Sequence, residues 1–214
     1  MPYAAKDRQE FIKHIFLKGK VLDLGGMLSN EIPYAICGIS TLKQIKNAVL
    51  MNFEHLPFKN SVFDTVVSYH YLDLISYEAL GHVFKEIKRV MHTDAVFSFL
   101  TMLWIPQSEA QRSNLFFNEI LKSVNAIYQH EPEELCRLLA ISGFEEITTQ
   151  SIKREITIPE EFVKEHLRIL SHLLKKRKSL KSLAKQYLAH VEMHGEAMLP
   201  AIHFMAKKHE KETS

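Results

Sequence analysis

The stretch from Lys20 to Gly26, which reads KVLDLGG, constrains the fold more than any other part of the sequence. An apolar run that contains Asp23 and ends in a glycine pair is typical of a buried parallel strand that breaks into a tight turn. Gly25 and Gly26 let the backbone pass close to a ligand, and we expect a following helix to direct its free N–H groups at the same place. The stretch therefore predicts the first strand of an α/β sheet, with a nucleotide-type cofactor at its carboxyl end.

The length of the chain fits one α/β domain. Its 214 residues are too few for two full domains of about 150 residues each. We expect a single domain over 1–214, with a core at 18–152 and 199–208 and a helical insertion at about 157–195. The net charge of +2 does not by itself indicate a nucleic-acid-binding protein.

Cysteine usage and hydropathy indicate the compartment. Cys37 and Cys136 are far apart and form no CxxC motif, which argues against a disulfide framework or a zinc site and favours a reducing cytoplasm. The polar start from Met1 to Glu10 does not read as a signal peptide. The longest apolar run, Ala95 to Ile105, is shorter than the roughly 20 residues of a membrane-spanning helix, so we expect no membrane span.

Strand and helix patterns alternate along most of the chain, which favours a doubly wound parallel sheet. Ser76 is placed to cap one helix, Thr157 and Glu160 have the spacing of a capping box, and Gly195 is placed to end a later helix. Further helices are expected at 4–17, 41–47, 108–128 and 132–143. Strands are expected at 34–39, 48–53, 63–68, 95–104, 144–152 and 199–206.

Five segments, in order along residues 18–150, resemble the class I S-adenosylmethionine-dependent methyltransferases. The closest subgroup is the small-molecule one typified by quinone-biosynthesis methyltransferases. The resemblance implies a Rossmann-like, seven-stranded, mostly parallel sheet with helices on both faces. It also implies an antiparallel last strand and a helical insertion between strands six and seven. The segments that carry it are Val21 to Gly25, Asn52 to Phe58, Ser61 to Val67, Glu86 to Met91 and Glu133 to Phe144.

The resemblance implies S-adenosylmethionine as cofactor, bound over the carboxyl ends of the strands. Asp23 would face its ammonium group, while Gly25 and Gly26 give the backbone clearance. For Asp23, a cap on the following turn is the structural alternative. The adenine would be bordered by Asn52 and Phe53, although core packing explains Phe53 equally well. The expected cofactor-binding residues are Asp23, Gly25, Gly26, Ser40, Asn52, Phe53 and Ser68.

The sequence departs from the family pattern at four places. Met27 and Ser29 stand where the glycine-rich loop has glycines, and their side chains would crowd the cofactor. The second strand ends in Gly38-Ile39-Ser40 and offers the ribose a hydroxyl in place of a carboxylate, a loss of about 1.5–3 kcal/mol. Asn52 replaces an aspartate but can still accept from an adenine amino group. The His92-to-Ala95 turn replaces a lysine-proline-glycine-glycine turn, which we interpret as a structural change.

Two side chains that leave the fourth strand are candidate catalytic residues. Methyl transfer from a sulfonium needs mainly an aligned nucleophile. Where the acceptor carries a proton, His70 is the best available base, with Tyr69 beside it. A packed or solvated histidine is the alternative reading of His70. The sequence predicts no metal ligands.

Three functions remain open. The leading hypothesis is methyl transfer to a small-molecule acceptor, under a roof made by the helices around 104–128 and 157–195. The second is a methyltransferase fold that has lost its cofactor and serves as a binding or scaffolding subunit. The third is an RNA methyltransferase that uses Lys175 to Lys178, with Lys181 and Lys185, although such a run is usually a solvated helix face. A nicotinamide dehydrogenase fits poorly because no GxGxxG follows the first strand. The oligomeric state stays open.

Overall fold

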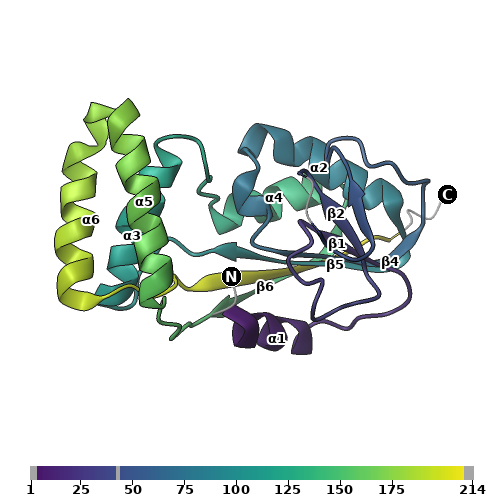
Figure 1. Cartoon of the computed structure of the whole chain (residues 1–214). Coiled ribbons are helices and arrows are strands. Elements are labelled where there is room, and N and C mark those ends of the chain that lie inside the picture. The colour runs from purple at the N-terminus through teal and green to yellow at the C-terminus, as the bar shows by residue number, and fades with distance from the viewer. Residues whose placement is uncertain (1–3, 42–43, 210–214) are drawn as a thin grey trace. The chain divides into compact units, whose positions relative to one another are not determined.

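A computed structural model describes residues 4–41 and 44–209, which form two compact units (Figure 1). We call them the sheet unit and the helical unit. The expected single domain, with its core and insertion boundaries, stays a prediction. Within the described residues, the sheet unit comprises 5–101, 130–150 and 202–209, and the helical unit comprises 4, 102–129 and 151–201.

The described chain contains a seven-stranded sheet with the strand order β3-β2-β1-β4-β5-β7-β6. Parallel pairing joins β1 to β2 and β4, β2 to β3, and β4 to β5. The last strand in the chain, β7, is inserted between β5 and β6 and runs antiparallel. The expected Rossmann-like fold class is therefore confirmed. The strands are β1 (Val21–Leu24), β2 (Ile36–Ile39), β3 (Ala48–Leu50), β4 (Phe63–Tyr69), β5 (Met91–Met102), β6 (Glu145–Ile152) and β7 (Ala201–Lys207).

Backbone hydrogen bonds at its two ends fix the direction of β7. Near its end, the Lys208 N–H donates to the carbonyl of Ala95 at 3.1 Å. Near its start, the Pro200 carbonyl accepts from the Leu103 N–H at 2.9 Å. The residue numbers along β7 thus rise as those along β5 fall, which is the antiparallel arrangement.

Helices cover both faces of the sheet in the sheet unit (Figure 1). On one face, α2 packs its Phe84 ring against Phe97 and Phe99 of β5, with ring centroids 5.9 and 6.1 Å apart. On the other, α1 places Phe11 6.1 Å from Tyr69 and 5.2 Å from His203. This unit contains α1 (Ala5–Lys13), the 3-10 helix η2 (Leu72–Leu74), α2 (Tyr77–Val90) and α4 (Pro132–Ile141).

The helical unit has an apolar core of its own, built around Phe117, Leu170 and Tyr187. Each of these side chains comes from a different helix, and apolar burial of this kind holds the three helices together. Gly195 ends the last of them with a φ of +67°, as its position in the sequence predicts. The helices are α3 (Glu109–Lys122), α5 (Glu160–Lys176), the 3-10 helix η3 (Lys178–Leu180) and α6 (Lys181–His194).

Several local expectations are wrong. The described residues 25–35 contain only turns and bends, so the helix expected after β1, which Pro33 was expected to limit to very few residues, does not form. Of the helix expected at 41–47, residues 42–43 lie outside the described residues, and the rest contains a turn. Ser76 does occupy the N-cap of α2, as expected, although its side chain makes no capping hydrogen bond. The Thr157 capping box does not form, because Thr157 makes a β-bridge with Ala197 and α5 begins after Pro159.

Candidate functional site

Asp23 lies on β1 at the point where the sequence predicts cofactor binding, and its side chain is fully buried. Its Oδ2 accepts a hydrogen bond from the Leu28 N–H at 2.8 Å. Oδ1 has no hydrogen-bond partner within the described part of the chain. Burial raises the pKa of Asp23 from 3.8 to about 7, the charge of Glu31 adds to the rise, and the N–H groups of Leu28 and Met27 oppose it. The site therefore holds one buried acceptor oxygen that a cationic donor would satisfy.

The two glycines after β1 have left-handed backbones, with φ of +93° at Gly25 and +64° at Gly26. Such angles strongly favour glycine. A Cβ added at Gly25 would overlap the Tyr71 ring, and one at Gly26 would lie 3.1 Å from Ile45 and 3.2 Å from Ile39. The clearance at Gly25 is therefore filled by the chain's own Tyr71.

Tyr71 also contacts the ends of the two neighbouring strands. Its ring centroid lies 4.7 Å from that of Phe53, which follows β3. Its hydroxyl shares a hydrogen bond with the Ser40 side chain at the end of β2. Burial raises the pKa of Tyr71, and the bond with Ser40 partly opposes that rise. Three of the expected cofactor residues, Gly25, Ser40 and Phe53, thus meet at Tyr71, a residue after the fourth strand to which the sequence assigned no role.

The remaining expected cofactor residues have separate surroundings. Asn52 is exposed, and its Oδ1 accepts from the Glu54 N–H at 2.9 Å, which closes a local turn. Ser68 is fully buried on β4, and its hydroxyl has no partner among the described residues. In the sheet register Ser68 pairs with Leu24 and Asp23 with Val67, so Asp23 and Ser68 point to opposite faces.

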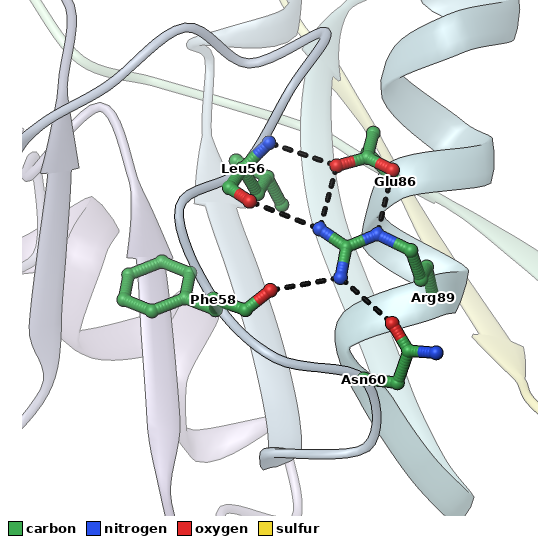
Figure 2. Close-up of polar contacts among 5 residues, drawn as sticks. All are labelled: Leu56, Phe58, Asn60, Glu86 and Arg89. Carbon is green, nitrogen blue, oxygen red and sulfur yellow. Dashed lines mark hydrogen bonds and ion pairs between the residues drawn. The ribbon is translucent and has the colours of Figure 1, made fainter.

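An arginine clamp holds the loop between β3 and β4 (Figure 2). Arg89 of α2 donates to the carbonyls of Leu56 and Phe58 at 2.9 and 2.8 Å, and to Asn60 Oδ1 at 2.9 Å. It also binds Glu86 through two hydrogen bonds of 2.7 Å, and Glu86 accepts from the Leu56 N–H at 2.8 Å. The hydrogen bond from Arg89 lowers the pKa of Glu86. The clamp joins two of the five resembling segments, because Glu86 and Arg89 of one bind the backbone of the other.

His70 has an unusual backbone at the end of β4. Its φ is +55°, a left-handed conformation that costs a non-glycine residue on the order of 1 kcal/mol. The ring Nδ1 lies 2.8 Å from Oδ2 of the buried Asp73, and the side chain is 11% exposed. A carboxylate at Nδ1 favours the tautomer with the proton on Nδ1 and the lone pair on Nε2. This is the geometry of an oriented base.

Tyr69 differs from its neighbour His70. Its side chain is fully buried, and its hydroxyl donates to Asp7 Oδ2 on α1 at 2.5 Å. The ring packs edge-on against His70, with the centroids 4.9 Å apart. These contacts tie β4 to α1 and support the position of His70.

The helical unit contains a buried polar network that the sequence reasoning missed. The carboxylate of Glu196, a residue 1% exposed, accepts from Asn114 Nδ2 at 2.6 Å and from the Tyr187 hydroxyl at 2.9 Å. His166 Nδ1 lies 3.0 Å away, and its ring stacks on Phe117 at 4.1 Å. Burial raises the pKa of Tyr187, as does the Glu196 charge. The contributors come from α3, α5 and α6, so no single segment carries a signal for the network.

The basic residues that kept the RNA hypothesis open extend from the end of α5 through η3 into α6. Lys175, Lys176 and Lys178 are exposed, and Arg177 donates to the carbonyl of Ser123 at 3.3 Å. This is the ordinary geometry of a solvated helix end.

Among the described helices, none combines the length and apolar character that a bilayer crossing needs.

Comparison with known proteins adds evidence at the level of the family. Residues 38–99, less than half of the chain, match the family model described as a methyltransferase domain. No curated protein matches the sequence.

Similar folds occur among solved structures. A cyclopropane-fatty-acyl-phospholipid synthase-like protein from Lactobacillus casei has a TM-score of 0.71 and 15% identity, over 96% of this chain and 91% of that one. A SAM-dependent methyltransferase from Archaeoglobus fulgidus has a TM-score of 0.57 and 15% sequence identity, and the match covers 95% of this chain and 92% of that one. Phosphoethanolamine N-methyltransferase 2 from Haemonchus contortus was solved with S-adenosyl-L-methionine. It has a TM-score of 0.56 and 12% sequence identity, and the match covers 96% of this chain and 53% of that one. This chain has the fold of the class I S-adenosylmethionine-dependent methyltransferases.

Proposed function

We propose that the protein is a methyltransferase that transfers the methyl group of S-adenosylmethionine to a small-molecule acceptor. The buried Asp23 Oδ1 is the observation that carries the proposal, because a buried acceptor oxygen with no partner among the described residues fits the ammonium group of the cofactor. The family match over 38–99 supports it. The neighbour from Haemonchus contortus, by its name, methylates phosphoethanolamine, which supports a small acceptor.

In this proposal the chain's own residues bind and orient. Asp23 holds the ammonium group, and Gly25 and Gly26 allow the main chain to approach the ligand. Asn52 and Phe53 border the adenine, while Ser40 and Ser68 remain candidate polar contacts. When bound, S-adenosylmethionine supplies an electrophilic methyl group on a sulfonium. The subgroup related to quinone biosynthesis and a cytoplasmic location stay predictions.

His70 is the proposed base. The Asp73 carboxylate at its Nδ1 orients the ring and stabilises the cationic form that results when Nε2 takes a proton from the acceptor. Tyr69, whose hydroxyl is bonded to Asp7, is proposed to position His70 and takes no part in proton transfer.

The second candidate function is a binding or scaffolding subunit. One observation favours it: the Tyr71 ring fills the clearance at Gly25. In that case Asp23 is a cap on the turn after β1 and binds no ligand, as its hydrogen bond with the Leu28 N–H allows.

Calorimetric titration with S-adenosylhomocysteine separates the two functions. The methyltransferase predicts saturable binding of one ligand per chain, weakened at least about tenfold in Asp23→Asn because the ammonium loses its charged partner. The control Glu10→Gln, an exposed acid on α1, should bind as the unmodified protein does. The absence of binding heat at high micromolar ligand would instead support the subunit.

A further inference from the structure

Three side chains with metal-binding atoms lie together on the helical unit. Glu109 is the first residue of α3, and His190 and His194 lie in the last turns of α6. Each offers one ligand atom, and these atoms lie within 4.8 Å of one another. We propose that Glu109, His190 and His194 bind a zinc ion that links the start of α3 to the end of α6. This proposal is independent of the proposed methyl transfer.

The spacing on α6 favours such a site. Residues four apart on a helix lie on the same face, and the rings of His190 and His194 are 4.7 Å apart between centroids. Imidazole nitrogen together with a carboxylate oxygen is a donor set that zinc binds readily. The sequence signal for the site was the HxxxH spacing in α6, but Glu109 is brought to it only by the packing of α3 on α6.

Ser113 orients His190 for this role. His190 Nδ1 lies 3.1 Å from Ser113 Oγ, and the Ser113 hydroxyl donates in turn to the Glu109 carbonyl at 3.4 Å. Ser113 therefore accepts from Nδ1–H, so that Nε2 of the neutral ring carries the lone pair. Hydrogen bonds of this kind to the second ring nitrogen are a common feature of zinc-binding histidines.

The Nε2 atom of His190 lies 3.1 Å from Oε2 of Glu109. A lone pair and a carboxylate oxygen at this distance repel unless a cation neutralises them. Two ligands of a tetrahedral zinc ion, each about 2.0–2.1 Å from the metal, lie about 3.3 Å apart. The separation of these two atoms is therefore already close to that of a bound pair, and His194 needs only a side-chain rotation to complete three ligands.

The surroundings hold the His190 ring in place and leave the other two side chains open to solvent. Phe116 of α3 packs edge-on against His190, with centroids 5.3 Å apart. Arg112 Nε lies 3.9 Å from Glu109 Oε2, too far for a hydrogen bond that would compete strongly with a metal. Glu109 and His194 are exposed, so an ion can enter from solvent.

Zinc binding can be measured by competition with a chromophoric chelator on the full chain, after removal of any affinity tag. We expect one zinc ion per chain with a dissociation constant in the micromolar range or below, and a rise of the melting temperature with Zn²⁺ but not with Mg²⁺. Glu109→Gln and His194→Ala should each weaken binding by at least tenfold, and Ser113→Ala by about tenfold. Substitution with Co²⁺ should give the intense visible absorption of a tetrahedral site.

The matched control is His172→Ala, which removes an exposed histidine from α5 of the same unit and should leave zinc affinity unchanged. Both ligand variants change exposed side chains, so loss of folding does not confound them. If the unmodified chain binds no zinc, or if His172→Ala weakens binding as much as His194→Ala does, the site is an ion pair between Glu109 and a protonated His190 and the proposal is overturned.

Discussion

The carboxyl group of Asp23 is fully buried, and burial disfavours its charged form. Among the described residues, Oδ2 accepts a hydrogen bond from the Leu28 N–H and Oδ1 has no partner. The result is a pKa raised from 3.8 to about 7. Because a bound ammonium would stabilise the charged form, the carboxyl group whose charge is disfavoured by burial is also the one that would bind the cofactor.

Asp23→Asn is predicted to change how stability depends on pH. The folded-state pKa of Asp23 lies above its unfolded value, so the stability that this group contributes is fully present below pH 3.8 and is lost as the pH rises to about 7. Asparagine does not ionise, so the variant does not lose this stability as the pH rises. Its unfolding free energy should therefore rise relative to the unmodified protein between pH 4 and pH 7.5, by up to the order of 4 kcal/mol. Urea unfolding at both pH values measures the effect, and a difference that does not change with pH would contradict it.

The Tyr71 ring packs against Gly25, where the proposed cofactor would lie. Tyr71→Ala removes the ring that lies against Gly25 and is predicted to tighten S-adenosylhomocysteine binding by about tenfold, because no ring has to be displaced. Tyr71→Phe keeps the ring and loses only the bond to Ser40, so its gain should be smaller. Calorimetry on the two variants checks the order. Weaker binding by the alanine variant would mean that Tyr71 is part of the binding surface.

At the scale of elements, α2 does more than cover the sheet. Glu86 and Arg89 lie near its C-terminal end, and the Arg89 guanidinium donates hydrogen bonds to the loop that joins β3 to β4 (Figure 2). The loop begins next to Asn52 and Phe53, the proposed adenine contacts. The end of α2 therefore holds the loop that follows the proposed adenine contacts.

Arg89→Lys is predicted to destabilise the protein by about 2 kcal/mol, because an ammonium cannot reproduce the planar set of donors to Leu56, Phe58 and Glu86. Hydrogen exchange in 56–60 should become faster. Lys85→Ala, an exposed change on the same helix, should stay within about 0.5 kcal/mol of the unmodified protein. Equal urea midpoints for Arg89→Lys and Lys85→Ala would contradict the account.

Most elements could be predicted from local sequence, because their signals are local. The β-branched run of β4 and the Gly195 stop are confirmed. The segment after β1 was mispredicted, since its Leu28 N–H binds the Asp23 side chain and does not begin a helix. The position of Tyr71 against Gly25 was inaccessible for a related reason. It depends on the packing of three strand ends, which no sequence period records.

At the scale of the whole molecule, the sequence and its family resemblance together predicted the architecture of the sheet but not the buried contacts of the helical unit. The strand-helix alternation and the five resembling segments were sufficient for a seven-stranded sheet with an antiparallel β7. Glu196 and its partners, like Glu109 and His190, become neighbours only when α3, α5 and α6 pack. Buried polar clusters of this kind require tertiary structure to be found.

The central claim is that the turn after β1 binds S-adenosylmethionine, and a crystal soaked with S-adenosylhomocysteine tests it most directly. The account predicts electron density for the ligand beside Gly25 and Gly26, with its ammonium group within hydrogen-bond distance of Asp23 and the Tyr71 ring moved away from Gly25. Density that shows Tyr71 still packed on Gly25 at saturating ligand, with no nucleoside beside it, would contradict the account. The fold would then stand, but the proposed methyltransferase activity would not.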